Sequence, residues 1–269
     1  MKKLLFFISM ALILTQLLSI AYIRELFSSV TSPQQVLSPA RNSTLNAFIL
    51  PIVFIIAINL YLFLFKFKIS LKLFRLYFLA ISLFSWLIIL SILFPYIHIG
   101  AISDILFIIV LLSPFVLMKT KYRYLSEDIF AMSLSSIAGA SLALMFSLKS
   151  LFITIALLSL LDYYFVLKNK KIVKIAEKMK EARIPIGIAV GSEKKRMALG
   201  YGDLIFSAGL VSAAFIDGGF AEAISIGFFA SLSLFLYLNY FMKKGKALPA
   251  LPPIFIGSLV GAIISWVLI

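Results

Sequence analysis

The stretch Leu199-Gly200-Tyr201-Gly202-Asp203-Leu204-Ile205-Phe206 opens an apolar run that continues to Ile216. Apolar runs of about 20 residues, the length that a helix needs to cross a bilayer, recur along the whole chain. A carboxylate inside such a run is costly in hydrocarbon, so Asp203 indicates a functional site. The stretch therefore predicts a polytopic helical membrane protein with a reactive group in its interior.

The composition agrees with this fold class, because 62% of the 269 residues are hydrophobic and the mean hydropathy is +1.10. We expect an all-α polytopic membrane protein with nine transmembrane helices in a single membrane-embedded domain. Within it, residues 1–150 would form a scaffold and residues 151–269 a catalytic half. The nine predicted spans are Leu4–Ile23, Ala47–Phe65, Leu73–Phe94, Ile102–Met118, Ile129–Phe146, Leu151–Leu167, Ala198–Ile216, Ala221–Met242 and Leu251–Ile269.

The formal charge of +14 would suggest a nucleic-acid partner in a soluble protein. In this assignment, however, all but three of the 25 Lys and Arg residues fall on one side of the membrane. The exceptions are Arg24, Arg41 and Lys149. Because cytoplasmic loops carry the excess of Lys and Arg, we expect a cytoplasmic N-terminus, an external C-terminus and no nucleic-acid partner.

Several kinds of catalytic site are excluded by residue usage. The chain has no cysteine, which removes disulfides, thiol nucleophiles and Cys-based metal sites. Its one histidine, His98, falls in a predicted external turn, so neither a His-x-x-x-His zinc protease nor a Ser-His membrane protease is expected. No metal or other cofactor is expected.

The first apolar segment has two interpretations. Ser19-Ile20-Ala21 resembles a signal-peptide cleavage site, which leaves open whether residues 1–21 are retained. The segment exceeds the roughly 7 to 15 apolar residues usual in a signal peptide, so we favour a retained helix.

A second carboxylate interrupts the sixth predicted span, in Ser159-Leu160-Leu161-Asp162-Tyr163-Tyr164-Phe165. Asp162 precedes Lys168 by six residues, and Asp203 follows Arg196 by seven. At about 1.5 Å per residue, both lie on the order of 9 to 10 Å from the cytoplasmic charges. Equal depth on adjacent antiparallel helices is the geometry that a pair of cooperating carboxylates requires.

The other nine acidic residues have an ordinary explanation, because they fall in loops or at the ends of predicted spans, where water reaches them. They are Glu25, Asp104, Glu127, Asp128, Glu177, Glu181, Glu193, Asp217 and Glu222.

The glycines beside Asp203 have two interpretations. Without a Cβ atom, Gly200 and Gly202 let the helix begin loosely and let water or a substrate backbone approach the carboxylate. Close packing of helices would explain the same pair.

The connection between the sixth and seventh spans contains two predicted elements. Residues 168–180 place apolar side chains at helical spacing between lysines, which predicts that the sixth span continues as an amphipathic helix bound to membrane lipid. Ile184–Val190, which includes Ile186 and Ile188, is typical of a short strand broken by proline and glycine. The free edge of this strand could accept an extended peptide.

Prolines mark the cytoplasmic entrance of the last span, in Ala247-Leu248-Pro249-Ala250-Leu251-Pro252-Pro253. They predict irregular backbone with free amides and carbonyls, which a membrane protein tolerates only where that backbone is buried or lines a wet cavity. An ordinary helix start with proline in its first turn is the alternative. Further along, Gly257 and Gly261 match the small-residue motif of helix packing.

Together these motifs resemble the presenilin and signal peptide peptidase family of intramembrane aspartyl proteases, in its compact microbial form. Gly200-Tyr201-Gly202-Asp203 matches the family's Gly-x-Gly-Asp, and Pro249-Ala250-Leu251 matches its Pro-Ala-Leu. In the sixth span the family usually has Tyr-Asp, whereas here Leu161 precedes Asp162 and Tyr163 follows it. The predicted orientation resembles that of presenilin rather than that of signal peptide peptidase.

The resemblance implies an aspartic endopeptidase that cuts peptide bonds within transmembrane segments or signal peptides. Asp162 and Asp203 would be catalytic, sharing one proton while a water molecule attacks the scissile carbonyl, so the rate would depend on pH as a bell. Its partners would be transmembrane-helix substrates and membrane lipid, and its oligomeric state stays open. The residues implied in substrate positioning are Gly200, Tyr201, Gly202, Pro249, Ala250, Leu251, Ile186, Ile188 and Tyr163.

Two other functions remain open. A prepilin peptidase also uses a Gly-x-Gly-Asp aspartate, but that family places lysine where this chain has Ile205. A proton-coupled transporter could use the same carboxylates as a relay, although no inverted repeat of broken helices is evident.

Overall fold

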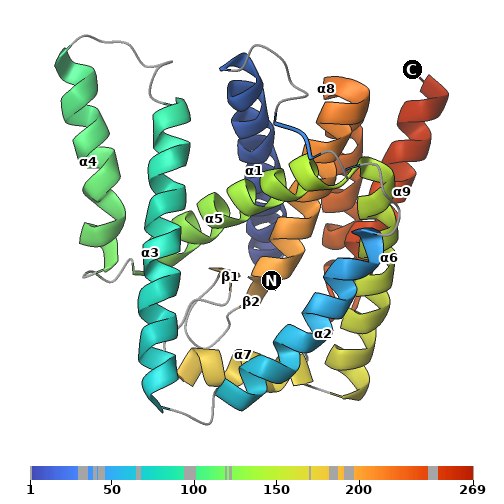
Figure 1. Cartoon of the computed structure of the whole chain (residues 1–269), viewed down its shortest axis with the longest axis horizontal. Helices are drawn as coiled ribbons and strands as arrows, with labels where there is room; N and C mark the ends of the chain where they lie inside the picture. The colour runs from blue at the N-terminus through green and yellow to red at the C-terminus, as the bar shows by residue number, and fades with distance from the viewer. Residues whose placement is uncertain are drawn as a thin grey trace.

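The structure of the chain is a computed structural model in which helices surround one central, broken helix (Figure 1). The predicted Ile186 and His98 lie outside the described residues. The structure describes residues 2–29, 36–38, 41, 46–64, 68–93, 101–118, 120, 123–169, 171–181, 187–190, 197–241 and 248–268.

Each of the nine predicted spans has a helical counterpart in the described part of the chain. The sixth corresponds to α6 with the π-helical turn η3, and the seventh and eighth to the two halves of α8. The helices are α1 (Lys2–Ser28), α2 (Asn46–Leu64), α3 (Lys68–Leu93), α4 (Ala101–Met118), α5 (Arg123–Met145), α6 (Leu148–Tyr163), η3 (Tyr164–Lys168), α7 (Lys171–Glu181), α8 (Tyr201–Phe241) and α9 (Leu251–Leu268).

The long helix α8 is two helices joined at a sharp break. Gly219 has φ 87° and ψ −173°, a conformation that glycine adopts and other residues rarely do. Beyond the break the chain packs back on itself, since Gly227 in the second half lies against Val211 in the first. The break therefore turns one apolar run of 41 residues into two neighbouring spans.

α8 is central because it packs on α9, α1 and α5. Small residues make the close approaches: Gly139 of α5 lies against Ala208 and Gly209, and Gly261 of α9 lies against the backbone at Ile226. The prediction that Gly261 belongs to a packing motif is therefore confirmed. Two clusters of buried apolar residues result, one near the break and one near the start of α8.

The predicted strand at Ile184–Val190 is corrected by the structure. Within the described residues, the chain has β1 (Gly187–Val190) paired antiparallel with β2 (Met197–Gly200), so that Ala189 faces Ala198. β2 occupies the residues where the seventh span was expected to begin, and α8 starts only at Tyr201. Hydropathy could not reveal this, because a short apolar run is compatible with a strand or with a helix.

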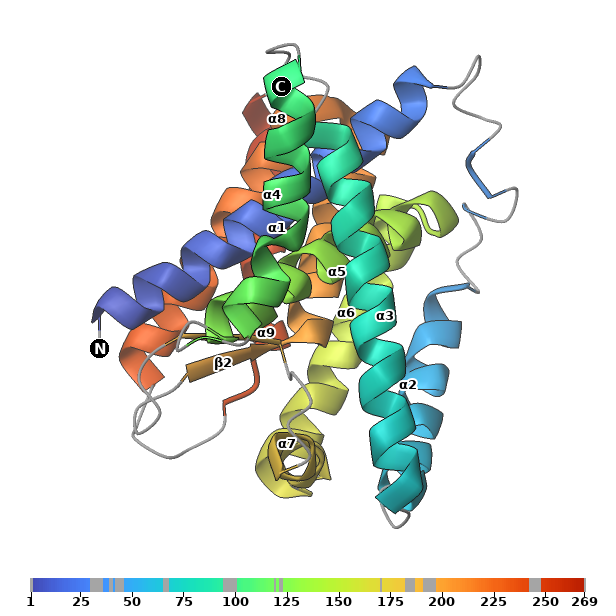
Figure 2. The ribbon, with the colours of Figure 1, turned by 90° about the vertical axis from the view of Figure 1, so that its left-hand side faces the viewer.

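The amphipathic segment does not continue α6 as expected. It forms the separate helix α7, which contacts η3 and α2. Figure 2 shows α7 nearly end-on while α6 rises away from it, so the two helices run in different directions.

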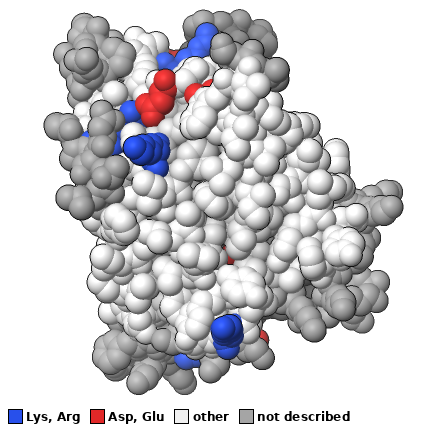
Figure 3. Space-filling view, turned by 90° about the vertical axis from the view of Figure 1, so that its right-hand side faces the viewer, with Lys and Arg blue, Asp and Glu red and all other residues white. Residues whose placement is uncertain are grey.

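The surface has the character of an integral membrane protein. Five described helices are long and apolar enough to cross a bilayer, and shorter apolar helices lie in α2, α4 and α9. Figure 3 shows one face on which nearly all charged atoms lie near the two ends, with an almost uncharged belt between them. Large apolar side chains are exposed on this fold, as a lipid environment requires: Leu160, Val116, Trp266 and Val267 are examples.

Candidate active site

Asp162 lies in the last turn of α6, where that helix packs against α9. Its residue is 7% exposed, and its Oδ2 accepts a hydrogen bond of 3.3 Å from the backbone N–H of Leu251. The backbone amide of Ala250 also interacts with the carboxylate. Asp162 is therefore buried against the proline-rich entrance of α9.

The prolines explain why this amide meets a side chain. Residues 248–250 are not helical, and α9 begins at Leu251 with Pro252 and Pro253 in its first turn. The two interpretations of the proline motif are therefore both correct. Irregular backbone at residues 248–250 leads into a helix that has prolines in its first turn. Helix N-termini carry unbonded N–H groups, and the two prolines have none, so Leu251 keeps the first free donor of the helix.

Asp203 lies in the first turn of α8 and is half-buried. Its Oδ2 accepts a hydrogen bond of 3.2 Å from the backbone N–H of Gly200, the residue just before the helix. This is the backward-reaching half of a capping box, in which the third helical residue bonds the amide of the cap residue. Asp203 therefore also stabilises the start of its own helix.

The helices that carry the two carboxylates lie side by side. α6 packs against α8, and Asp162 and Asp203 lie near enough that the charge of one acts on the other. Neighbouring acids in an apolar bundle disfavour each other's ionisation.

A π-helical turn begins two residues after Asp162. η3 covers Tyr164–Lys168, and the N–H of Asn169 donates to the carbonyl of Tyr164 over 3.0 Å, five residues back. Such turns often occur at functional sites, where they change which face a side chain presents.

The residues expected around the aspartates have different environments. Ile188, Ala250 and Leu251 are buried, so their side chains serve the core and only their backbone could face a substrate. Tyr163 is half-exposed, and Gly202 has open space beside it. Ile188, Tyr201 and Ala250 belong to one apolar cluster with Leu199 and Leu204, and Pro249 is buried as well.

Two neighbours of the site had no signal in the sequence. Tyr237, in the second half of α8, interacts electrostatically with Asp162 and Tyr163. Phe78 of α3 packs edge-on against Tyr201 with ring centroids 4.9 Å apart. Both are aromatic residues in uniformly apolar runs, so only folding sets them apart from their neighbours.

Three acids that were expected to be solvated have specific partners instead. Glu222 is 6% exposed and accepts a hydrogen bond of 2.8 Å from Trp266 Nε1. Asp128 Oδ1 accepts a bond of 2.8 Å from the amide of Ala189 in β1. Asp217 forms an ion pair with the buried Arg41. The sequence contained one indication of this pair, because Arg41 is one of only three Lys and Arg residues predicted on the external side.

No group of three or more metal-ligating side chains occurs among the residues that the structure describes.

Comparison with solved structures identifies a similar fold. The structure of a presenilin family intramembrane aspartate protease in the C222 space group matches with a TM-score of 0.67, covering 98% of this chain and 99% of that one. The two sequences are 18% identical. No protein-family model and no curated protein matches the chain. The likeness therefore concerns the fold.

Proposed function

We propose that this protein is an intramembrane aspartic endopeptidase with Asp162 and Asp203 as its catalytic pair. The observation that carries the proposal is that two carboxylates on the packed helices α6 and α8 are each bonded to a backbone amide and lie near enough for the charge of one to act on the other. The likeness of the fold to that of a presenilin family protease supports it. The substrates would be transmembrane segments of membrane proteins or signal peptides.

The hydrogen bonds indicate which carboxylate oxygens are available for the reaction. Each aspartate gives one oxygen to an amide, Asp162 to Leu251 and Asp203 to Gly200, and so keeps the other for water or substrate. One ionised carboxylate takes a proton from water, and the other, protonated, donates to the scissile carbonyl. Losing the shared proton at high pH or adding a second at low pH stops the reaction, so the rate passes through a maximum.

The hairpin supplies an edge for an unwound substrate, and that edge belongs to β2 rather than to β1 as expected. The amide of Ala189 donates to Asp128 on α5, so it points away from β2 and the outer edge of β1 lies against α5. In an antiparallel pair, the residue opposite such an outward-facing residue also directs its backbone outward, which here is the exposed Ala198. A substrate strand on β2 would lead to Gly200 and then to Asp203.

The test is proteolysis by purified protein in proteoliposomes, with a panel of single-span substrates and mass spectrometry of the fragments. Asp162→Asn and Asp203→Asn each keep an oxygen that can accept the amide bond, so both should fold and both should lose cleavage. Glu222→Gln, which changes a buried acid outside the pair, is the matched control and should remain active.

Robust cleavage by either Asn variant would remove the proposed pair. A wild-type protein that shows substrate-dependent proton flux without fragments would be a transporter, and the proposal would be wrong.

A further inference from the structure

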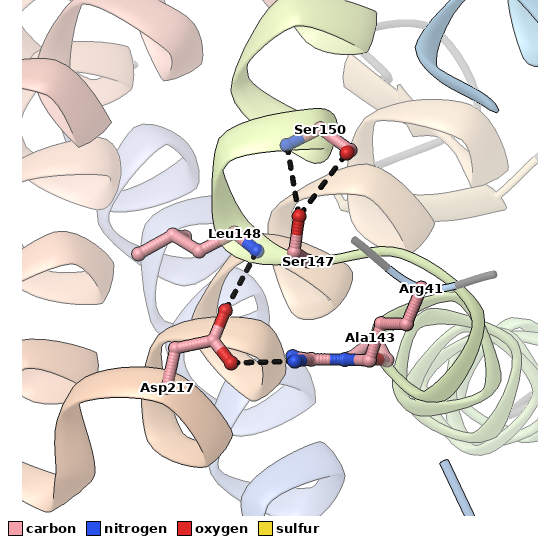
Figure 4. Close-up of polar contacts among 6 residues, drawn as sticks. All are labelled: Arg41, Ala143, Ser147, Leu148, Ser150 and Asp217. Carbon is pink, nitrogen blue, oxygen red and sulfur yellow. Dashed lines mark hydrogen bonds and ion pairs between the residues drawn. The ribbon is translucent and has the colours of Figure 1, made fainter. Parts of the chain in front are cut away.

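A polar cluster joins the opposite ends of α6 and α8 from those that carry the aspartates. Asp217, at the end of the first half of α8, accepts a hydrogen bond of 2.9 Å at Oδ2 from the backbone N–H of Leu148, the first residue of α6. Its Oδ1 accepts a bond of 2.6 Å from Arg41 Nη1. In Figure 4 the carboxylate lies between these two donors and points one oxygen at each.

Arg41 is held from several sides, which fixes the direction of the carboxylate. Its Nε donates to the carbonyl of Ala143 at the end of α5, and its own carbonyl accepts from the N–H of Ser147, each over 3.0 Å. Arg41 is 7% exposed. A buried cation with these partners leaves Asp217 one orientation in which both of its oxygens are bonded.

The distances along the two helices are equal. Fourteen residues separate Leu148 from Asp162, and fourteen separate Asp203 from Asp217. At about 1.5 Å per residue, each arm is about 21 Å long. Two antiparallel helices joined at one end, with arms of the same length, bring the residues at the other ends to the same depth.

We propose that Asp217 is a positioning residue that sets the depth of Asp162 relative to Asp203 through its bond to the start of α6. The inference rests on the proposed function only for its catalytic consequence. The contact of Asp217 with Leu148 and Arg41 is called the clamp below. The clamp holds the end of the first half of α8, which has no straight helical continuation beyond the break at Gly219.

The register can be measured without any proteolysis, because the chain has no cysteine of its own. The double substitution Asp162→Cys with Asp203→Cys is treated in membranes with a short bifunctional thiosulfonate, and the cross-linked fraction is followed over time. Adding Asp217→Ala should slow cross-linking severalfold, since α6 can then slide along α8. An unchanged rate in folded protein overturns the proposal.

The catalytic consequence is a selective fall in kcat. A misplacement of about 1 Å in a reacting group can cost about 100-fold in rate, so Asp217→Ala should lower kcat roughly 10- to 100-fold with KM within twofold. Asp217→Asn keeps an acceptor oxygen for Leu148 and should recover much of this loss. A rise in KM with kcat unchanged would contradict a positioning role.

Glu222→Ala is the matched control. Glu222 lies just beyond the break at Gly219, close in sequence to Asp217, but its partner is Trp266 of α9 rather than a residue of α6. Its loss should leave the cross-linking rate and kcat near those of wild type, and an effect equal to that of Asp217→Ala would overturn the proposal. If the protein never cleaves peptides yet its cross-linking depends on Asp217, the clamp stands and the proposed function fails.

Discussion

Three aspartates of this protein bond the backbone amide at the start of a helix. Asp162 meets the start of α9, Asp203 the start of α8 and Asp217 the start of α6. A helix N-terminus carries unbonded N–H groups and about half a positive charge, so it stabilises a carboxylate that apolar surroundings would otherwise penalise. The same kind of bond thus holds the two proposed catalytic aspartates at one end of the bundle. At the other end, through Asp217, it sets the proposed position of α6 along α8.

The two glycines beside Asp203 should respond differently to a methyl group. A Cβ on Gly200 would meet Asp203 Oδ2 at 3.2 Å, whereas a Cβ on Gly202 would meet no atom within 4 Å. Gly200→Ala should displace the carboxylate and lower kcat. Gly202→Ala should fold with stability equal to wild type or up to ~1 kcal/mol higher, because alanine favours a helix over glycine.

If the open space beside Gly202 receives substrate, Gly202→Ala should raise KM while the unfolding temperature does not fall. Steady-state kinetics and a thermal unfolding curve on both variants provide the measurement. An unchanged KM in Gly202→Ala would mean that substrate does not approach there.

Among the elements, the hairpin depends most on a contact distant in sequence. Asp128 lies in the second turn of α5 and Ala189 lies in β1, 61 residues later, and their bond directs the hairpin so that β2 keeps the outer edge. The predicted fifth span began only at Ile129 because hydropathy does not register the polar residues with which α5 begins. The last of these residues, Asp128, anchors the strand.

Removing the outward amide of β2 should weaken substrate binding and leave the hairpin paired. Ala198→Pro deletes an N–H that points away from β1, and proline is tolerated on an edge strand. We expect KM for a helical substrate to rise severalfold with little change in stability. Substrate titration and thermal unfolding measure the two effects.

Ala189→Pro is the control on the other edge. It removes the donor to Asp128 and should destabilise the protein by roughly 1.5–3 kcal/mol, the usual range for a hydrogen bond to a charged group. If Ala198→Pro bound substrate normally, the β2 edge would be excluded.

At the scale of the molecule, α1 belongs to the bundle. It packs on α8 and α5, and Gln16 Nε2 donates to Ser207 Oγ over 2.7 Å in the interior. Leu5, Ile8 and Leu12 are among the most deeply buried side chains. Cleavage after residue 21 would remove core residues, which favours the retained helix over a signal peptide.

The orientation in the membrane can be tested on the same cysteine-free background. Lys149 and Lys178 are both exposed, at the start of α6 and in α7 respectively. With a cytoplasmic N-terminus, Lys149→Cys should react with a membrane-impermeant maleimide in intact cells, and Lys178→Cys only after permeabilisation. The opposite pattern would invert the predicted topology.

Local chemistry made the helical fold and the two unusual acids predictable. An apolar run of about 20 residues has few stable alternatives to a membrane helix. A carboxylate inside such a run is energetically costly and therefore indicates a functional site. Positions along a helix convert directly to depth, which is why Asp162 and Asp203 could be expected at one level.

Contacts between residues that are distant in the sequence could not be predicted from hydropathy and helical spacing. The pairing of β2 with β1, the bond from Asp128 to Ala189, the burial of Glu222 and the pairing of Arg41 with Asp217 each join segments that no sequence spacing relates. A buried polar group must find a hydrogen-bond partner, but which one it finds depends on how the helices pack. Packing thus decided the distant hydrogen-bond partners of Asp128, Asp162, Asp217 and Glu222, whereas hydropathy had already placed these residues in a helix or near a helix end.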